Sequence, residues 1–506
     1  MANLINKKRI ALNTFFLYSK TIITMLIALY STRLILNGLG NMDFGIYGSV
    51  GGAIVMLEAL NIAMAQATQR FMNYSEGAGD KEKLLLIFNN SAIIHIGLGL
   101  AIVLLLLAFY YPLFNGILSI PNDRVMAAKS IYLFLVFSTF FTIITVPYDA
   151  LINAHENFLY YSVVGIIVAV LKLLAALAVI WWYADKLILY GFLMALISVV
   201  NMLIMRIYCK RKYAECSFLP RQYADRKIMK EIGSFASWNF VGALATIFGN
   251  HGSTILMNHF FGPILIAAKN IGDQVCSQVS ILTSNMTKAL NPVIMKLEGG
   301  GDREAMINLT LASCRYSFLL YMIVAAPFLM NTEYLLRFWL HKVPEWAVLF
   351  CQLQVIRTLF EQLFTPLRTA LVAQGSIKIL NLSELVLGVL TLGLLGICYY
   401  LEAQPAWHYY ISIALLVFVS GGVKVYLCKR FCGLPYRLFA TTILVRAFIS
   451  VLVFIIVSYI YSENFVYSCF WSLIFAIIVA ILLYFPIMLN HDELYIVLSK
   501  IKKHKL

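Results

Sequence analysis

Long apolar segments follow one another along almost the whole chain. Each is about 20 residues or longer, which is the length an α-helix needs to cross the hydrocarbon core of a bilayer. The segments are continuous and rich in Leu and Ile rather than alternating, which favours helices over barrel strands. Of the 506 residues, 61% are hydrophobic and 12% are charged, whereas soluble proteins are about a quarter charged. The sequence therefore predicts an all-α polytopic membrane protein.

The hydropathy pattern predicts about fourteen transmembrane helices. The expected spans are 11–36, 44–72, 86–111, 126–148, 158–183, 187–208, 232–257, 263–290, 309–331, 345–367, 377–400, 407–427, 437–460 and 465–488. The connections between them are short, and the longest runs from about Cys209 to Glu231. We therefore expect no folded domain outside the membrane.

The distribution of Lys and Arg predicts the orientation of the spans. With fourteen spans and a cytoplasmic N-terminus, 26 of these cations fall on the cytoplasmic side and about six on the other. Cytoplasmic loops carry such an excess, so both termini are expected in the cytoplasm. The same asymmetry accounts for the net charge of +15. We therefore do not interpret that charge as a nucleic-acid signal, which would need a soluble basic face.

A short hydrophilic loop occurs twice. EGAGDKE, Glu76–Glu82, returns 222 residues later as EGGGDRE, Glu298–Glu304, and further matches keep that offset. A later pair, TVPYDALINA and FTPLRTALVA, matches at a slightly shorter offset. Glycines permit a tight turn, and the Asp followed by Glu suits the cap and first turn of the next helix.

Six predicted spans separate the two loops, so both lie on the same side of the membrane. This predicts two parallel six-helix repeats related by an axis along the membrane normal, with spans 13 and 14 left over as a C-terminal helix pair. The expected domains are an N-lobe at 1–208, a basic cytoplasmic linker at 209–231, a C-lobe at 232–428, and the extra pair with a basic tail at 429–506.

Two sequence stretches carry a family resemblance. STRLILNGLGNMDFGIYGSV contains Arg33, Gly40 and Tyr47, and VPYDALINAHE closes span four. With the doubled loop, the chain resembles the multidrug/oligosaccharidyl-lipid/polysaccharide (MOP) exporter superfamily over roughly residues 10 to 430. Within it the chain is most similar to Wzx-type polysaccharide flippases, with lipid II flippases and the multidrug extruders (MATE) as relatives.

The resemblance implies a function. A protein of this kind moves an undecaprenyl-diphosphate-linked oligosaccharide from the inner to the outer leaflet of the bacterial inner membrane, by alternating access of two lobes around a central cavity. It is expected to act as a monomer, in surface polysaccharide biosynthesis, with possible proton or sodium coupling. It needs no cofactor.

Ionisable residues within the spans are candidates for binding and coupling, because they are costly in a bilayer. The deep cations suit phosphate oxygens and predict a cationic cavity: Lys20, Lys172, Lys269 and Arg357, with Arg33 at the outer end. The coupling-ion candidates are Glu58, Asp273 and Glu361. The polar lining of the cavity is expected to include Asn61, Asn270, Gln274 and Gln354.

Other interpretations of these residues stay open. The spacing of Lys269 and Asp273, like that of Arg357 and Glu361, also fits intrahelical ion pairs that neutralise each other. Lys20 and Lys172 could instead snorkel to the interface, and Arg33 is equally well explained as an interfacial anchor.

The alternative functions share the same membrane setting. A proton- or sodium-coupled multidrug extruder is expected to carry an anionic cavity, and the deep cations argue against it. A membrane glycan polymerase or ligase is expected to have a large outer loop, which is absent from the sequence. No nucleophile, paired-carboxylate or phosphate-loop motif stands out, and the nine cysteines lack metal-ligand spacing. We therefore expect neither catalysis nor a bound metal.

Overall fold

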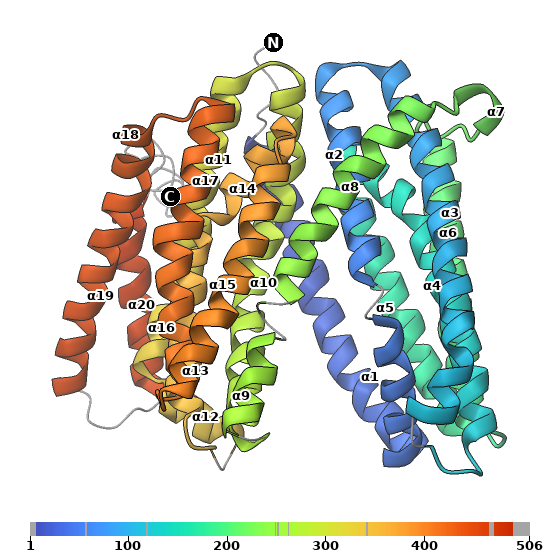
Figure 1. Cartoon of the computed structure of the whole chain (residues 1–506), viewed down its shortest axis with the longest axis horizontal. Coiled ribbons are helices and arrows are strands. Elements are labelled where there is room, and N and C mark those ends of the chain that lie inside the picture. The colour runs from blue at the N-terminus through green and yellow to red at the C-terminus, as the bar shows by residue number, and fades with distance from the viewer. Residues whose placement is uncertain are drawn as a thin grey trace, which may run out of the picture. The chain divides into compact units, whose positions relative to one another are not determined.

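A computed structural model of the chain describes residues 7–55, 58–117, 120–247, 249, 252–261, 263–340, 343–464 and 470–488. Throughout these ranges the regular structure is helical and contains no strand (Figure 1). The chain divides into two compact units, Met1–Phe240 with Gly299–Gly301 and Val241–Glu298 with Asp302–Leu506. We call them the N-terminal unit and the C-terminal unit. The domain boundaries predicted at 208, 231 and 428 stay predictions.

The N-terminal unit is a bundle of long helices. They are α1 (Lys7–Val55), α2 (Glu58–Ala78), α3 (Lys81–Pro112), α4 (Val125–Ala154), α5 (Phe158–Trp181), α6 (Lys186–Lys212), the short α7 (Pro220–Tyr223) and most of α8 (Arg226–Ile247). A π-helical turn, Leu113–Ile117, extends α3. Helix α1 packs along α5, and α4 packs against α3 and α6 (Figure 1).

Helix α1 is kinked in the middle of the family-like motif Ser31–Val50. Gly40 has φ 78° and ψ 169°, a backbone conformation that side chains rarely adopt and glycine tolerates. The break divides the 49 residues of α1 into two helical segments. Helix α1 contains the predicted first span (11–36) and the beginning of the second (44–55), and residues 58–72 of the second span lie in α2.

An ion cluster joins three helices at one end of the N-terminal unit. Arg124, directly before α4, donates from Nε to Asp43 at 2.8 Å and from Nη1 to Asp185 at 2.9 Å. Asp185 also caps α6, accepting from the backbone N–H of Leu187 and Ile188. Burial alone would lower the pKa of Arg124, but the hydrogen bonds and charges of the two carboxylates raise it overall. Arg124 therefore holds the starts of α4 and α6 to Asp43 of α1, which is a structural role.

The C-terminal unit contains more and shorter elements. They are α9 (Ser253–Phe261), α10 (Pro263–Gly299), α11 (Arg303–Met330), α12 (Thr332–Leu340), α13 (Ala347–Gln362), α14 (Thr365–Gln374), α15 (Lys378–Tyr400), α16 (Trp407–Ala414), α17 (Gly422–Leu427), α18 (Tyr436–Phe439), α19 (Val445–Asn464) and α20 (Phe470–Met488). π-Helical segments at Leu415–Gly421, Cys428–Cys432 and Ala440–Leu444 join several of them. Helix α20 packs against α11 and α19 (Figure 1).

Ten helical segments in the described ranges are long and apolar enough to cross a membrane, and the shorter apolar stretch Phe475–Met488 accompanies them. The described residues of expected spans 44–72, 232–257 and 263–290 are helical, but these spans are not among the ten, since α2, α8 and α10 carry more polar residues. The prediction of an all-α polytopic membrane protein is confirmed. The exact number of fourteen stays a prediction with which these helices are consistent.

The doubled loop has the same structure in both places. Gly79 and Gly301 have φ 71° and 79° and make the tight turn. Asp80 then caps α3, accepting from the Lys83 N–H at 2.9 Å, and Asp302 caps α11, accepting from the Ala305 N–H at 3.1 Å. The predicted turn and helix cap are therefore confirmed in both copies.

Candidate functional site

Lys20 in the N-terminal unit lies against an aromatic ring. Its Nζ is 4.0 Å from the centroid of the Tyr161 ring, so α1 and α5 meet through a cation–π contact. Gly165, one turn along α5, leaves the space through which the Lys20 side chain runs, because a methyl group there would collide with its Cε. Gly165 and the Tyr161 ring together fix the position of the Lys20 ammonium group.

Asp149 on α4 belongs to the same group and was missing from the predicted site. Tyr161 interacts electrostatically with both Lys20 and Asp149. The sequence places Asp149 one residue beyond the predicted end of span four at 148, whereas α4 continues to Ala154. The predicted end of span four falls six residues short of the end of α4, and this left Asp149 outside the predicted span.

The other predicted residues of the N-terminal unit lie on α1, α2 and α5. Lys172 is exposed on α5, and Asn61 is buried on α2. The backbone at Arg33 lies in α1 and that of Glu58 begins α2, but both side chains fall outside the part of the chain that the structure describes. Their predicted roles stay predictions.

Two of the deep cations in the C-terminal unit form ion pairs within their own helices. On α10, Lys269 Nζ lies 2.6 Å from Asp273 Oδ2, and on α13, Arg357 Nη1 lies 3.5 Å from Glu361 Oε2. The Lys269 side chain is 7% exposed and that of Asp273 is 39% exposed. The i,i+4 pairing that the sequence left open is therefore present, and it neutralises both cations.

His408 brings these two ion pairs into one group. Its buried side chain, at the start of α16, interacts electrostatically with both Lys269 and Arg357. The neighbouring Tyr409, also buried, is subject to the charges of Asp273 and Arg357. We call Lys269, Asp273, Arg357, Glu361 and His408 the paired-ion cluster.

Packing between α10, α11 and α13 holds the paired-ion cluster in place. The Cys276 sulfur on α10 lies 2.9 Å from Thr358 Oγ1 on α13 and 3.3 Å from the Tyr321 hydroxyl on α11. Gly272 lets α10 approach the α13 backbone, with 3.4 Å from an added Cβ to Cys351 N. Phe350 and Tyr409 belong to an apolar core of the same unit.

The predicted polar lining of the C-terminal unit is only partly near these charges. Gln354, one turn before Arg357 on α13, is half-buried, and its carbonyl faces the Cys276 sulfur at 3.8 Å. Asn270 and Gln274 on α10 are exposed. His408 was not predicted, because its charged neighbours come from helices more than 50 residues away and no local motif marks it.

A third group of charges lies on α14, α15 and α17. Glu384 accepts from Arg368 and also lies 3.4 Å from Lys424 Nζ, while Arg368 donates to Asn381 at 3.0 Å. Two cations share one carboxylate here. The group is well satisfied by its own members, which favours a structural role. Among the described residues, no group of three or more His, Cys, Asp or Glu is placed to hold a metal ion.

Comparison with known proteins gives a family and a fold. The profile of the polysaccharide biosynthesis protein family matches residues 10–298, which is more than half of the chain. No curated protein matches the sequence.

Solved structures match most of the chain at low sequence identity. A MATE protein in complex with MaD3S has a TM-score of 0.74 and 15% identity, covering 84% of this chain and 96% of its own. A MOP superfamily transporter from Pyrococcus furiosus, whose binding pocket is described as having reverse polarity, has a TM-score of 0.70 and 16% identity, with the same coverages. An outward-facing multidrug resistance MATE family transporter matches with a TM-score of 0.69 and 16% identity, over 84% and 96% of the chains.

At such identities the structural likeness establishes the fold, and the family profile establishes the family. The predicted resemblance is thereby confirmed. The chain belongs to the polysaccharide biosynthesis protein family and has the fold of the MOP superfamily transporters.

Proposed function

We propose that this protein is a transporter that moves an undecaprenyl-diphosphate-linked oligosaccharide from the inner to the outer leaflet of a bacterial inner membrane, for surface polysaccharide biosynthesis. Family membership supports a glycan pathway, and the fold supports alternating access of two lobes. The proposal includes cytoplasmic termini and a monomeric transporter. It assigns no catalytic step to the chain.

The observation that carries this proposal is the paired-ion cluster. A diphosphate needs cations, and a bare cation within a membrane protein costs several kcal/mol. Lys269 and Arg357 avoid this cost because Asp273 and Glu361 neutralise them. A diphosphate that replaces the carboxylates as the cations' partner exchanges one charge-assisted contact for another. The pairs therefore suit a site that is alternately empty and loaded.

The same exchange offers a means of coupling. Asp273 and Glu361 are 39% and 41% exposed, more than the cations that they neutralise. When a phosphate binds Lys269 and Arg357, the carboxylates of Asp273 and Glu361 are released, and each can bind a proton or a sodium ion. Asp273 and Glu361 are therefore the coupling residues of this proposal, and Lys20 is a further substrate cation in the other unit.

A cation-coupled multidrug extruder is the second candidate. Its support is the MATE fold of the matching structures and the presence of two partly exposed carboxylates in the paired-ion cluster. The two functions assign opposite roles to each pair. A flippase uses the cation for its substrate, whereas an extruder of drug cations uses the carboxylate.

Purified protein in liposomes distinguishes these functions. One set of vesicles contains fluorescent undecaprenyl-diphosphate oligosaccharide, and head-group exposure is followed with a membrane-impermeant quencher. A second set contains ethidium under a proton or sodium gradient. We expect exchange of the lipid between leaflets and no ethidium efflux. Ethidium efflux without lipid exchange would overturn the proposal in favour of the extruder.

A further inference from the structure

A pocket lies on the surface of the N-terminal unit. It has a volume of about 400 Å³. Its lining comes from the first turn of α5 and the last turns of α6: Tyr160, Ile204, Ile207, Tyr208, Arg211 and Lys212. The lining residues of α6 recur every three to four positions, so they share one face of that helix.

The pocket lies where an apolar helix meets a basic segment. Ile204 and Ile207 are within the membrane-spanning part of α6, and Ile207 is exposed. Arg211 and Lys212, one turn further, belong to the last turn of the helix. The pocket therefore combines an apolar wall with two cations at its polar end, as the interface of a leaflet requires.

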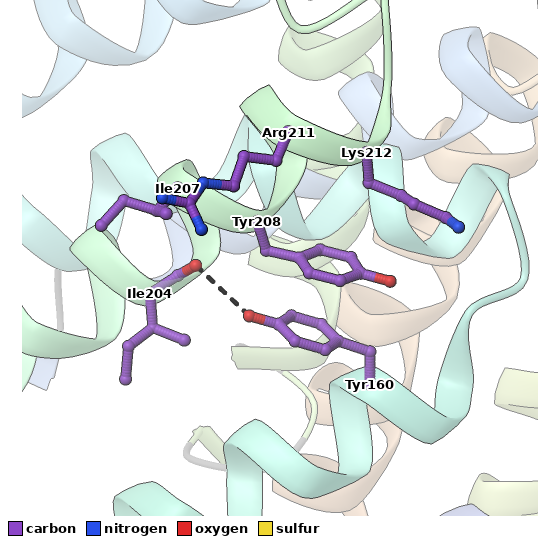
Figure 2. A pocket seen from close by; sticks show the side chains of 6 residues that line it. All are labelled: Tyr160, Ile204, Ile207, Tyr208, Arg211 and Lys212. Atoms are coloured by element: carbon purple, nitrogen blue, oxygen red, sulfur yellow. Dashed lines mark hydrogen bonds between the residues drawn. The ribbon is translucent and has the colours of Figure 1, made fainter.

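Two tyrosine rings line the pocket between the side chains of Arg211 and Lys212. Tyr160 and Tyr208 are stacked with their ring centroids 3.5 Å apart and their planes at 10°. Figure 2 shows the Arg211 and Lys212 side chains on either side of these rings, with the Tyr160 hydroxyl donating to the Ile204 carbonyl at 3.3 Å. Asn157 donates to the Tyr208 hydroxyl at 2.5 Å and fixes the second ring. The two tyrosine rings are therefore held in place without a ligand.

Carboxylates at this end of the unit have other partners. Glu76 and Glu215 lie on either side of His155, at 3.2 and 3.8 Å, and Glu156 lies 3.5 Å from Arg9. Across the described part of the chain, neither Arg211 nor Lys212 has an ion pair or a side-chain hydrogen bond. Two cations without protein counter-charge therefore face a pocket beside the membrane.

We propose that this pocket binds the phosphate headgroup of an anionic phospholipid from the adjacent leaflet, with Arg211 and Lys212 on the phosphate and the acyl chains along Ile204 and Ile207. Arg and Lys are suited to phosphate oxygens, and cations next to a membrane segment attract anionic lipids. The half-buried Ile204 and the exposed Ile207 favour a lipid over a free phosphate ion, because a free ion gains nothing from apolar side chains. This site is separate from the transported substrate.

The test measures lipid retention by native mass spectrometry of the full-length protein. Wild type is purified with phosphatidylglycerol, with phosphatidylcholine, or with phosphatidylglycerol plus excess inorganic phosphate. We expect phosphatidylglycerol to be retained selectively and not to be displaced by phosphate. The double variant Arg211→Gln/Lys212→Gln is expected to retain about tenfold less, from the loss of two cations next to the membrane.

Two further variants make the result specific. Lys227→Gln/Lys230→Gln removes the same charge from exposed positions of α8 outside the pocket and is expected to retain lipid as wild type does. Arg211→Lys/Lys212→Arg keeps both charges and is expected to retain it too. Equal retention by wild type and Arg211→Gln/Lys212→Gln would overturn the proposal, and so would displacement of the lipid by inorganic phosphate.

Discussion

The same loop precedes α3 and α11, but the two units hold their deep cations differently. Gly79–Asp80 and Gly301–Asp302 build the same turn and helix cap. In contrast, Lys20 in the N-terminal unit lies over the Tyr161 ring, while Lys269 in the C-terminal unit is paired with a carboxylate. The structural part of the repeat is therefore shared, and the charged part is specific to each half.

This difference has a physical consequence. A ring stabilises a cation without cancelling its charge, at about 0.5–2 kcal/mol, whereas a carboxylate neutralises it. In the N-terminal unit the Tyr161 ring is also subject to the charge of Asp149, so Lys20 belongs to a group that includes a carboxylate. The C-terminal unit releases its cations only when a competing anion or a proton takes the place of the carboxylate contact. In the proposed function, the paired-ion cluster of the C-terminal unit couples substrate to an ion.

The largest expected effect is on substrate affinity in the C-terminal unit. Lys269→Gln and Arg357→Gln each remove a charge-assisted contact of about 1.5–3 kcal/mol, so the Kd for undecaprenyl diphosphate is expected to rise about 10- to 100-fold. Microscale thermophoresis in detergent measures this. Arg337→Gln is the matched control, because Arg337 also forms an i,i+4 pair, with Glu333, but on an exposed helix. An equal loss of affinity in Arg337→Gln would show that the effect is not specific to the paired-ion cluster.

A smaller effect is expected in the N-terminal unit from Gly165→Ala. The added methyl group displaces Lys20 from the Tyr161 ring, and the loss of a cation–π contact predicts a roughly tenfold weaker Kd in the same assay. Gly97→Ala on α3 is the control, since an added Cβ meets nothing within 4 Å. An unchanged Kd for Gly165→Ala would show that the position of Lys20 does not matter for binding.

The smallest effect tests the shared part of the comparison. Asp80→Ala and Asp302→Ala each remove one helix cap, which costs about 1 kcal/mol. Because the two loops have the same geometry, we expect equal decreases in Tm, measured by scanning fluorimetry in detergent. Clearly unequal decreases would mean that the two copies are not structurally equivalent.

The sequence predicts whatever depends on local spacing. The doubled loop contains its own cap, and the i,i+4 spacing of Lys269 with Asp273 and of Arg357 with Glu361 already allows the observed pairs. The long apolar segments predict the helical membrane fold because backbone groups in lipid must bond within their own segment.

Contacts between distant helices escape this reasoning. The Tyr161 ring lies 141 residues after Lys20, and nothing in either local sequence marks the pair. His408 joins the paired-ion cluster through cations on α10 and α13, so its environment depends on packing rather than on its neighbours in the chain. Helices α2, α8 and α10 are long enough to cross a membrane but carry more polar residues than the ten apolar helices. Hydropathy therefore does not establish the number of spans.

The central claim is that the paired cations of the C-terminal unit take part in moving a lipid diphosphate. The most direct measurement is the rate of leaflet exchange of labelled undecaprenyl-diphosphate oligosaccharide in liposomes, for wild type, Lys269→Gln/Arg357→Gln and Arg337→Gln. We predict rapid exchange by wild type and Arg337→Gln and a rate near that of protein-free vesicles for the double variant. Exchange by the double variant at the wild-type rate would contradict the claim.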